Sequence, residues 1–87
     1  MNEPTLEEVQ KEIDKNYDFF LKELPNIINL YNNKYALLKN AEIIDYFDTM
    51  DDAIKYAKIR FEDGLYSIQK VNETPVSLGY IGSFLNA

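Results

Sequence analysis

The sequence predicts an α+β fold, with an N-terminal helix, a β-hairpin, a second helix and one or two further strands in a small mixed sheet. Apolar residues recur at three- and four-residue steps in two segments, which is the spacing of an amphipathic helix. Elsewhere they alternate with polar residues, as in half-buried strands. At 87 residues the chain fits a single domain, 1–87, with residues 1–4 and 82–87 expected to be flexible ends.

Residues 5–31 carry the first helical pattern. Thr5 is a suitable N-cap, and the acidic residues after it face the positive end of the helix dipole. Pro25 predicts a kink or a restart, because proline is tolerated at the first position of a new helix. Asn32-Asn33 should end the helix, since Asn tolerates left-handed backbone angles. The expected buried stripe consists of Leu6, Val9, Ile13, Tyr17, Phe20, Leu21 and Leu24.

Two strands, 34–39 and 42–47, are expected to form a hairpin around Asn40-Ala41. Ala41 is a poor second loop residue, because both positions of a two-residue loop favour positive φ. Such a loop would give favourable cross-strand pairs between Lys39 and Glu42, Leu37 and Ile44, and Tyr35 and Tyr46. One face of the hairpin would then carry Tyr35, Leu37, Ile44 and Tyr46, and the other Ala36, Leu38, Ile43 and Phe47.

The second helix is expected over residues 49–61. Thr49 opens it in a pattern that resembles a capping box, with Asp52 where Glu is usual. Asp63-Gly64 supplies the stop signal. The buried stripe is Ala53, Ile54, Ala57 and Phe61, and its small alanines would let the helix lie close to a sheet. A third strand over 65–71 should follow by a right-handed crossover, and then a turn and an irregular strand over 76–81.

The central block contains Lys34-Tyr35-Ala36-Leu37-Leu38-Lys39, Ala41-Glu42-Ile43-Ile44, Phe47-Asp48-Thr49, Asp52-Ala53, Phe61-Glu62-Asp63-Gly64 and Tyr66-Ser67-Ile68-Gln69-Lys70-Val71. This pattern resembles a widespread set of small uncharacterised bacterial proteins, catalogued as domains of unknown function, over roughly residues 17–75. In that set a hairpin tip with Asp-Gly or Asn-Gly precedes Phe-Asp-Thr, a helix and a strand. The chain departs from it at Ala41, where the set usually has Gly. The resemblance implies the order of elements and carries no activity.

Composition argues against several functions. The chain has 9 basic and 15 acidic residues, a net charge of −6, which disfavours direct nucleic-acid binding. The only close basic group, Lys55, Lys58 and Arg60, is expected to be an ordinary solvated helix face. Because the sequence has no His and no Cys, it lacks the usual transition-metal ligands and the Ser–His and Cys–His nucleophile pairs. We therefore expect no enzyme activity, no metal and no cofactor.

The N-terminus is polar and acidic, and no apolar run approaches the length of a membrane span. We therefore expect a cytoplasmic protein without a secretory signal or membrane association.

A candidate acidic patch consists of Asp45, Asp48, Asp51 and Asp52, four carboxylates within eight residues. Carboxylates can bind Mg²⁺ or Ca²⁺, but this spacing does not match a calcium loop. Three of them also suit the start of a helix, where they favour the dipole. The group is thus either a helix cap or a patch that binds a protein partner.

The expected function is a non-enzymatic protein-interaction module that binds a protein partner or itself. One helix cannot cover both apolar faces of the hairpin, so the other face requires the N-terminal helix or another protein. The candidate contact residues are Tyr35, Leu37, Ile44 and Tyr46, together with the acidic patch. The alternative is a phage-encoded, anti-CRISPR-like inhibitor of a host defence or nucleic-acid-binding complex, with a DNA-mimic surface. A third possibility is a small carboxylate-based enzyme.

Overall fold

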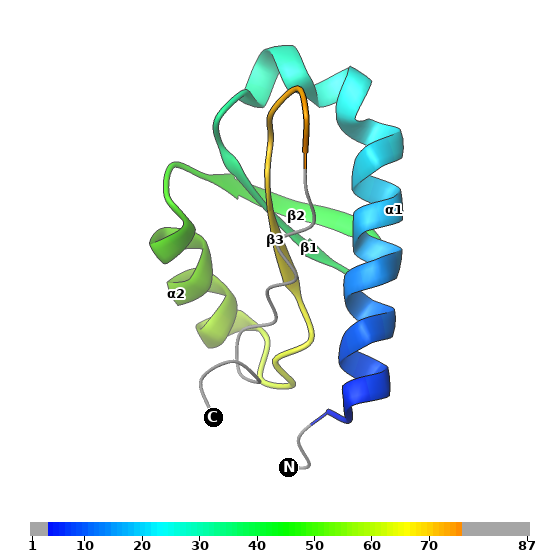
Figure 1. Ribbon diagram of the computed structural model, residues 1–87. Helices are drawn as coiled ribbons and strands as arrows, with labels where there is room; N and C mark the ends of the chain where they lie inside the picture. The colour runs from blue at the N-terminus through cyan, green and yellow to red at the C-terminus, as the bar shows by residue number, and fades with distance from the viewer. Residues whose placement is uncertain (1–3, 76–87) are drawn as a thin grey trace.

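The computed structural model describes residues 4–75, which form a three-stranded sheet between two helices (Figure 1). The elements are α1 (Leu6–Tyr31), β1 (Tyr35–Lys39), β2 (Glu42–Phe47), α2 (Met50–Arg60) and β3 (Ser67–Lys70). Figure 1 shows α1 on one side of the sheet and α2 on the other. The predicted α+β fold is therefore confirmed. The strand expected at 76–81 and the tail at 82–87 lie outside the described residues.

The sheet has the order β2-β1-β3, and β1 pairs antiparallel with both neighbours. The expectation of a mixed sheet is wrong here, because no neighbouring pair within residues 4–75 is parallel. The physical reason lies in the crossover. After α2 the chain enters the sheet beside β1 instead of beside β2, so the two strands that run in the same direction are separated by one that runs against them.

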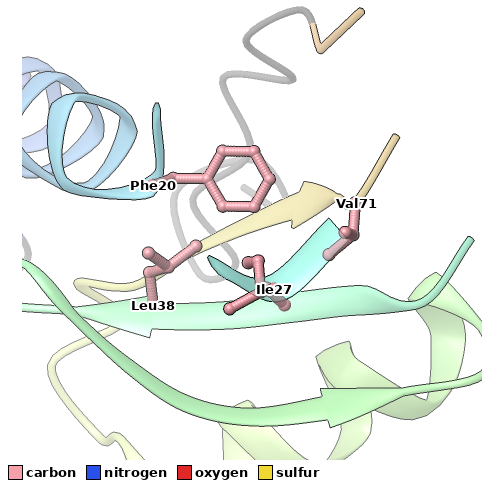
Figure 2. Packing of buried hydrophobic residues seen from close by; sticks show 5 residues of the cluster. Phe20, Ile27, Leu38 and Val71 are labelled. Atoms are coloured by element: carbon pink, nitrogen blue, oxygen red, sulfur yellow. The ribbon is translucent and has the colours of Figure 1, made fainter. Parts of the chain in front are cut away.

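Because β1 is the central strand, its alternating side chains fill two separate core layers. Ala36 and Leu38 lie in the layer under α1, where they join Phe20, Ile27 and Val71 (Figure 2). Leu37 lies in the layer under α2, with Ala53, Ala57, Tyr66 and Ile68. The two buried alanines let α2 lie close to the sheet, as expected. Each face of the sheet is thus covered by one helix.

The hairpin has the predicted two-residue loop, but its register changes along the strands. Lys39 pairs with Glu42, and Leu38 pairs with Ile43. The register then shifts by one residue, so that Leu37 pairs with Asp45 and Ile44 is the extra residue of a β-bulge. The predicted Leu37–Ile44 and Tyr35–Tyr46 pairs are therefore wrong. An inserted residue moves every later side chain of the strand to the opposite face. Tyr46 accordingly packs in the α1 layer and Phe47 in the α2 layer, the reverse of the prediction.

Helix α1 begins with a complete capping box. Thr5 Oγ1 accepts from the Glu8 amide at 3.1 Å, and the Glu8 carboxylate accepts from the Thr5 amide at 2.9 Å. The helix continues through Pro25, so a restart is not needed. Its axis changes direction in the last turns (cyan in Figure 1), which include Pro25 and give the predicted kink. Proline produces such a bend because it lacks an amide donor and its ring displaces the carbonyl one turn earlier.

The buried stripe of α1 differs from the predicted one at both its apolar and its polar positions. Leu6 and Leu21 are exposed, although the three- and four-residue spacing placed them in the core. Glu12 and Asn16 are buried instead, between Val9 and Phe20. Buried polar groups need hydrogen-bond partners, and these two find them at the tip of the hairpin.

Asn16 and Glu12 accept the amide hydrogens of the two loop residues. Asn16 Oδ1 accepts from the Ala41 amide at 2.7 Å, and Glu12 Oε2 accepts from the Asn40 amide at 3.0 Å. Asn16 Nδ2 donates to Glu12 Oε2 and to Ser67 Oγ, both at 3.0 Å, and to the Leu38 carbonyl oxygen at 3.3 Å. This polar network therefore ties α1 to the end of β1 where the hairpin loop and the first residue of β3 meet.

The same loop has the left-handed backbone that a two-residue hairpin requires. The φ angle is 52° at Asn40 and 59° at Ala41. Alanine is strained in this region because its Cβ approaches the following carbonyl oxygen. The Lys15 ammonium adds a further restraint, since it donates to Asn40 Oδ1 at 3.1 Å and pairs with Glu12 at 3.3 Å.

We predict that Asn16→Ala lowers the free energy of unfolding by about 2–3 kcal/mol, because it leaves buried polar groups of the hairpin and β3 unpaired. Asn26→Ala is the matched control, since Asn26 is an exposed residue of the same helix. We expect it to change stability by less than about 0.5 kcal/mol. Urea unfolding of both variants measures the difference, and equal losses would contradict a special role for Asn16.

We predict that Ala41→Gly raises the free energy of unfolding by about 1 kcal/mol, because glycine adopts a positive φ without strain. The opposite change at Gly64, where φ is 71°, should destabilise the fold. Thermal unfolding of the two variants tests both signs. A lower melting temperature for Ala41→Gly would show that the loop carries no strain to relieve.

Candidate interaction surface

The four residues of the predicted acidic patch all lie on the surface, but most of them have local roles. Asp48 forms an ion pair with Lys34, and Asp51 pairs with Lys55 at 3.2 Å. The Asp52 amide donates to Thr49 Oγ1 at 3.1 Å, which caps α2. Asp45 accepts from the Tyr46 amide at 2.8 Å on the exposed edge strand β2. Three of the four therefore sit at the start of α2, where their contacts are those of a helix terminus.

The predicted aromatic and apolar face is divided by the bulge. Tyr35, Leu37 and Ile44 pack in the α2 layer, whereas Tyr46 packs in the α1 layer. Leu37 is fully buried, and the other three are half-buried. These four side chains do not form one surface, because α2 covers the face that holds three of them.

Tyr46 stacks on Tyr31, with ring centroids 3.7 Å apart and planes inclined by 3°. The stack links the end of α1 to the edge strand β2. Burial is the largest of the causes that raise the pKa of the Tyr46 phenol, and the neighbouring Tyr31 and Glu23 raise it further. On the other face of the sheet Phe47 meets Tyr56 of α2, with centroids 5.3 Å apart.

A hollow open to solvent lies where α2 ends. It is lined by Lys39, Ile59, Arg60, Phe61, Glu62 and Asp63. Lys39 comes from the end of β1 and forms its inner wall, with only 17% of its side chain exposed. Its ammonium donates to both carboxylate oxygens of Asp63 at 3.0 Å and to the Leu65 carbonyl oxygen at 2.6 Å. These bonds hold the segment after α2 against the sheet.

The segment from Phe61 to Leu65 is further braced by its own backbone. The Phe61 amide donates to the Ala57 carbonyl oxygen at 2.8 Å, and the Gly64 amide donates to the Phe61 carbonyl oxygen at 3.2 Å. Asp63 Oδ1 accepts from the Leu65 amide at 2.9 Å. The Lys39 ammonium lies 5.0 Å from the centre of the Phe61 ring, a cation–π contact. Several contacts therefore hold the segment that lines the hollow against the end of β1.

Ile59 projects from the rim of this hollow with 85% of its surface exposed. It is the most exposed of the large apolar residues in the described part of the chain. Arg60 and Glu62 are also exposed and flank the half-buried Phe61 in sequence. The rim thus combines an apolar projection with charges of both signs, an aromatic ring and an Arg, and the last two are residue types enriched at protein interfaces.

Ile59 is not among the contact residues predicted from the sequence, although its helical position indicates that it is exposed. The buried stripe of α2 contains Ala53 and Ala57, so a residue two positions after Ala57 points away from the sheet. Ile59 is therefore an apolar residue on the polar face, between Lys58 and Arg60. The basic group noted there is a solvated helix face, as expected, apart from this one side chain.

Across residues 4–75 no group of three or more acidic, His or Cys side chains is placed to hold a metal ion. In the same part of the chain neither helix combines the length and the apolar character needed to cross a bilayer.

The stack of Tyr46 on Tyr31 gives a pH-dependent prediction. Since the pKa is raised in the fold, the neutral phenol stabilises the protein fully below the unfolded pKa of about 10. That contribution is lost as pH rises through the folded pKa. We expect stability to fall more steeply at alkaline pH in the wild type than in Tyr46→Phe, measured by urea unfolding at stepped pH. Equal slopes would contradict the raised pKa.

Comparisons with known proteins do not identify a relative. No family model matches the chain, and no curated protein and no solved structure gives a significant match. The likeness to small uncharacterised bacterial proteins thus stays a prediction from the residue pattern. Any function has to be argued from the surface itself.

Proposed function

We propose that this chain is a small protein-interaction module that binds another protein through the hollow at the end of α2. The observation that carries the proposal is Ile59, an 85% exposed apolar side chain on the rim of a braced hollow. Burying an isoleucine contributes about 1.5–3 kcal/mol, so a partner that covers it gains substantially from one residue.

Single exposed apolar residues are common and by themselves need no explanation. Leu6, Leu21 and Leu30 are examples on α1. Ile59 differs because a fixed concave surface lies beside it, with the Phe61 ring in its lining. An apolar projection next to a hollow lets a partner both cover Ile59 and insert a side chain of its own, which is the pattern of a binding hot spot.

The rigidity of the hollow supports binding. Association costs conformational entropy when loops or long side chains become ordered at the interface. Here the Lys39 ammonium and the Asp63 carboxylate are already held by each other and by the Leu65 backbone. The partner therefore does not have to order them, and more of the contact energy appears as affinity.

Binding is a better interpretation than catalysis. The sequence has no His and no Cys, the side chains that most often act as general base and nucleophile. The hollow is open, whereas sites for small substrates usually enclose most of the ligand. The mixed charges of Arg60 and Glu62 suit specific recognition of another protein surface.

The inhibitor with a DNA-mimic surface remains a prediction, and the acidic patch is its test. Asp48 and Asp51 each have a lysine partner, so part of the patch charge is neutralised locally. A surface that imitates phosphates would have to act through Asp45 and Asp52. The experiment below includes these residues as a separate arm.

We predict that Ile59→Asp abolishes partner capture when the purified protein is immobilised in source-cell lysate treated with nuclease. Leu30→Asp is the matched control, since Leu30 is 74% exposed on a different helix. Both changes place a carboxylate in the last turn of a helix, so the control carries the same small dipole penalty of about 0.3–1 kcal/mol. A third variant carries Asp45→Asn and Asp52→Asn, and captures at low and high salt are compared by mass spectrometry.

Each outcome decides between the two functions. A protein that is lost with Ile59→Asp and retained with Leu30→Asp supports binding at the hollow. A protein that is lost with the Asn variant and with high salt, but retained with Ile59→Asp, favours the acidic inhibitor and overturns the proposal. Equal capture by all variants also overturns it, since no residue named here would then contribute.

A further inference from the structure

We infer that the protein that binds this hollow is a second copy of the chain, so that the two copies form a two-fold symmetric dimer through the ends of their α2 helices. This inference rests on the proposed function and names its partner. In a two-fold dimer the same patch is used by both copies, so each residue must meet its complement in that patch. The rim of the hollow satisfies this condition in both its shape and its charge.

The two-fold arrangement pairs one exposed apolar side chain with the lining of one hollow, and it does so twice. Ile59 is the projecting apolar side chain, and Phe61 lies within the lining of the hollow. A two-fold axis near these residues places Ile59 of each copy over Phe61 of the other. The interface then buries Ile59 and Phe61 of both copies, which removes four apolar side chains from water.

The charges flanking Phe61 are self-complementary as well. Arg60 and Glu62 are exposed, and neither has an ion-pair partner within residues 4–75. They have opposite signs and lie on either side of the aromatic residue. The same two-fold axis brings Arg60 of each copy to Glu62 of the other, which gives two intermolecular ion pairs.

The hollow is also a place where this acidic protein can approach itself. The whole chain has a net charge of −6, so two copies repel each other at most orientations. Among the residues that line the hollow, Lys39 and Arg60 balance Glu62 and Asp63, so the local net charge is zero. Two copies that meet through their hollows therefore avoid the electrostatic repulsion between the acidic surfaces of the rest of the protein.

The exposed edge of β2 is a weaker surface for self-association. Strand β2 has a free edge within the described residues, but it carries the exposed carboxylates Glu42 and Asp45 and a bulge. A bulge and edge charges are the features by which proteins prevent strand-to-strand pairing. Two β2 strands paired across a two-fold axis would bring these carboxylates together.

Sedimentation equilibrium of the full chain between about 1 μM and 1 mM tests the dimer directly. We expect a concentration-dependent monomer–dimer equilibrium in the wild type. Ile59→Asp should weaken it by roughly a hundredfold, since loss of a central apolar anchor has this magnitude. Leu30→Asp should leave the dissociation constant unchanged.

Charge reversal gives a test that loss of folding cannot imitate. Arg60→Glu alone and Glu62→Arg alone should each weaken the dimer by about tenfold, because each places like charges in contact. An equimolar mixture of the two variants should restore dimerisation to the wild-type level, since both ion pairs re-form across the heterodimer. Failure of the mixture to restore dimerisation would overturn the two-fold arrangement.

The outcomes separate this inference from the proposed function. A wild type that stays monomeric up to about 1 mM, yet captures a different protein through Ile59, overturns the dimer and leaves the module intact. A dimer that is unaffected by Ile59→Asp places the contact elsewhere and overturns the inference. Monomeric protein without any Ile59-dependent capture overturns both.

Discussion

The buried pair of Glu12 and Asn16 holds the two-residue loop of the hairpin against α1, and the rest of the fold is arranged around this contact. The loop amides of Asn40 and Ala41 are part-buried against α1, and the carboxylate and amide oxygens of the buried pair supply their hydrogen-bond partners. Because Asn16 also donates to Ser67, the same residue aligns β3 with the hairpin. A polar network that is fully connected can specify one register of a sheet more sharply than apolar contacts can.

The fixed hairpin tip also positions the proposed interaction surface. Lys39 is the last residue of the central strand β1 and immediately precedes the loop. Its ammonium donates to the Asp63 carboxylate and to the Leu65 carbonyl oxygen. The hollow at the end of α2 is therefore supported by a strand that is itself held by α1. This chain of contacts connects the hollow to the buried network of α1 without a disulfide, since the sequence has no Cys.

The bulge in β2 distributes aromatic residues to both faces of the sheet. Tyr46 stacks on Tyr31 of α1, and Phe47 packs near Tyr56 of α2. In a regular strand the two residues would occupy the reverse faces, as the hairpin register predicted. The edge strand is thus fastened to both helices, and the bulge together with Asp45 discourages pairing with another chain. This agrees with the proposal that association occurs at the end of α2 and not along β2.

The sequence by itself determined the features that depend on neighbouring residues. Thr5 and Thr49 begin the helices, Asn33 and Gly64 take the positive φ angles after them, and the order of helices and strands follows from local periodicity. The roles of Asp51 and Asp52 at a helix start were likewise readable, because capping acts within one turn. Only the tertiary structure decided what depends on distant partners. The burial of Glu12 and Asn16 depends on a hairpin tip about 25 residues later in the sequence. The bulge places Tyr46 and Phe47 against different helices, and the hollow beside Ile59 is completed by Lys39 of β1.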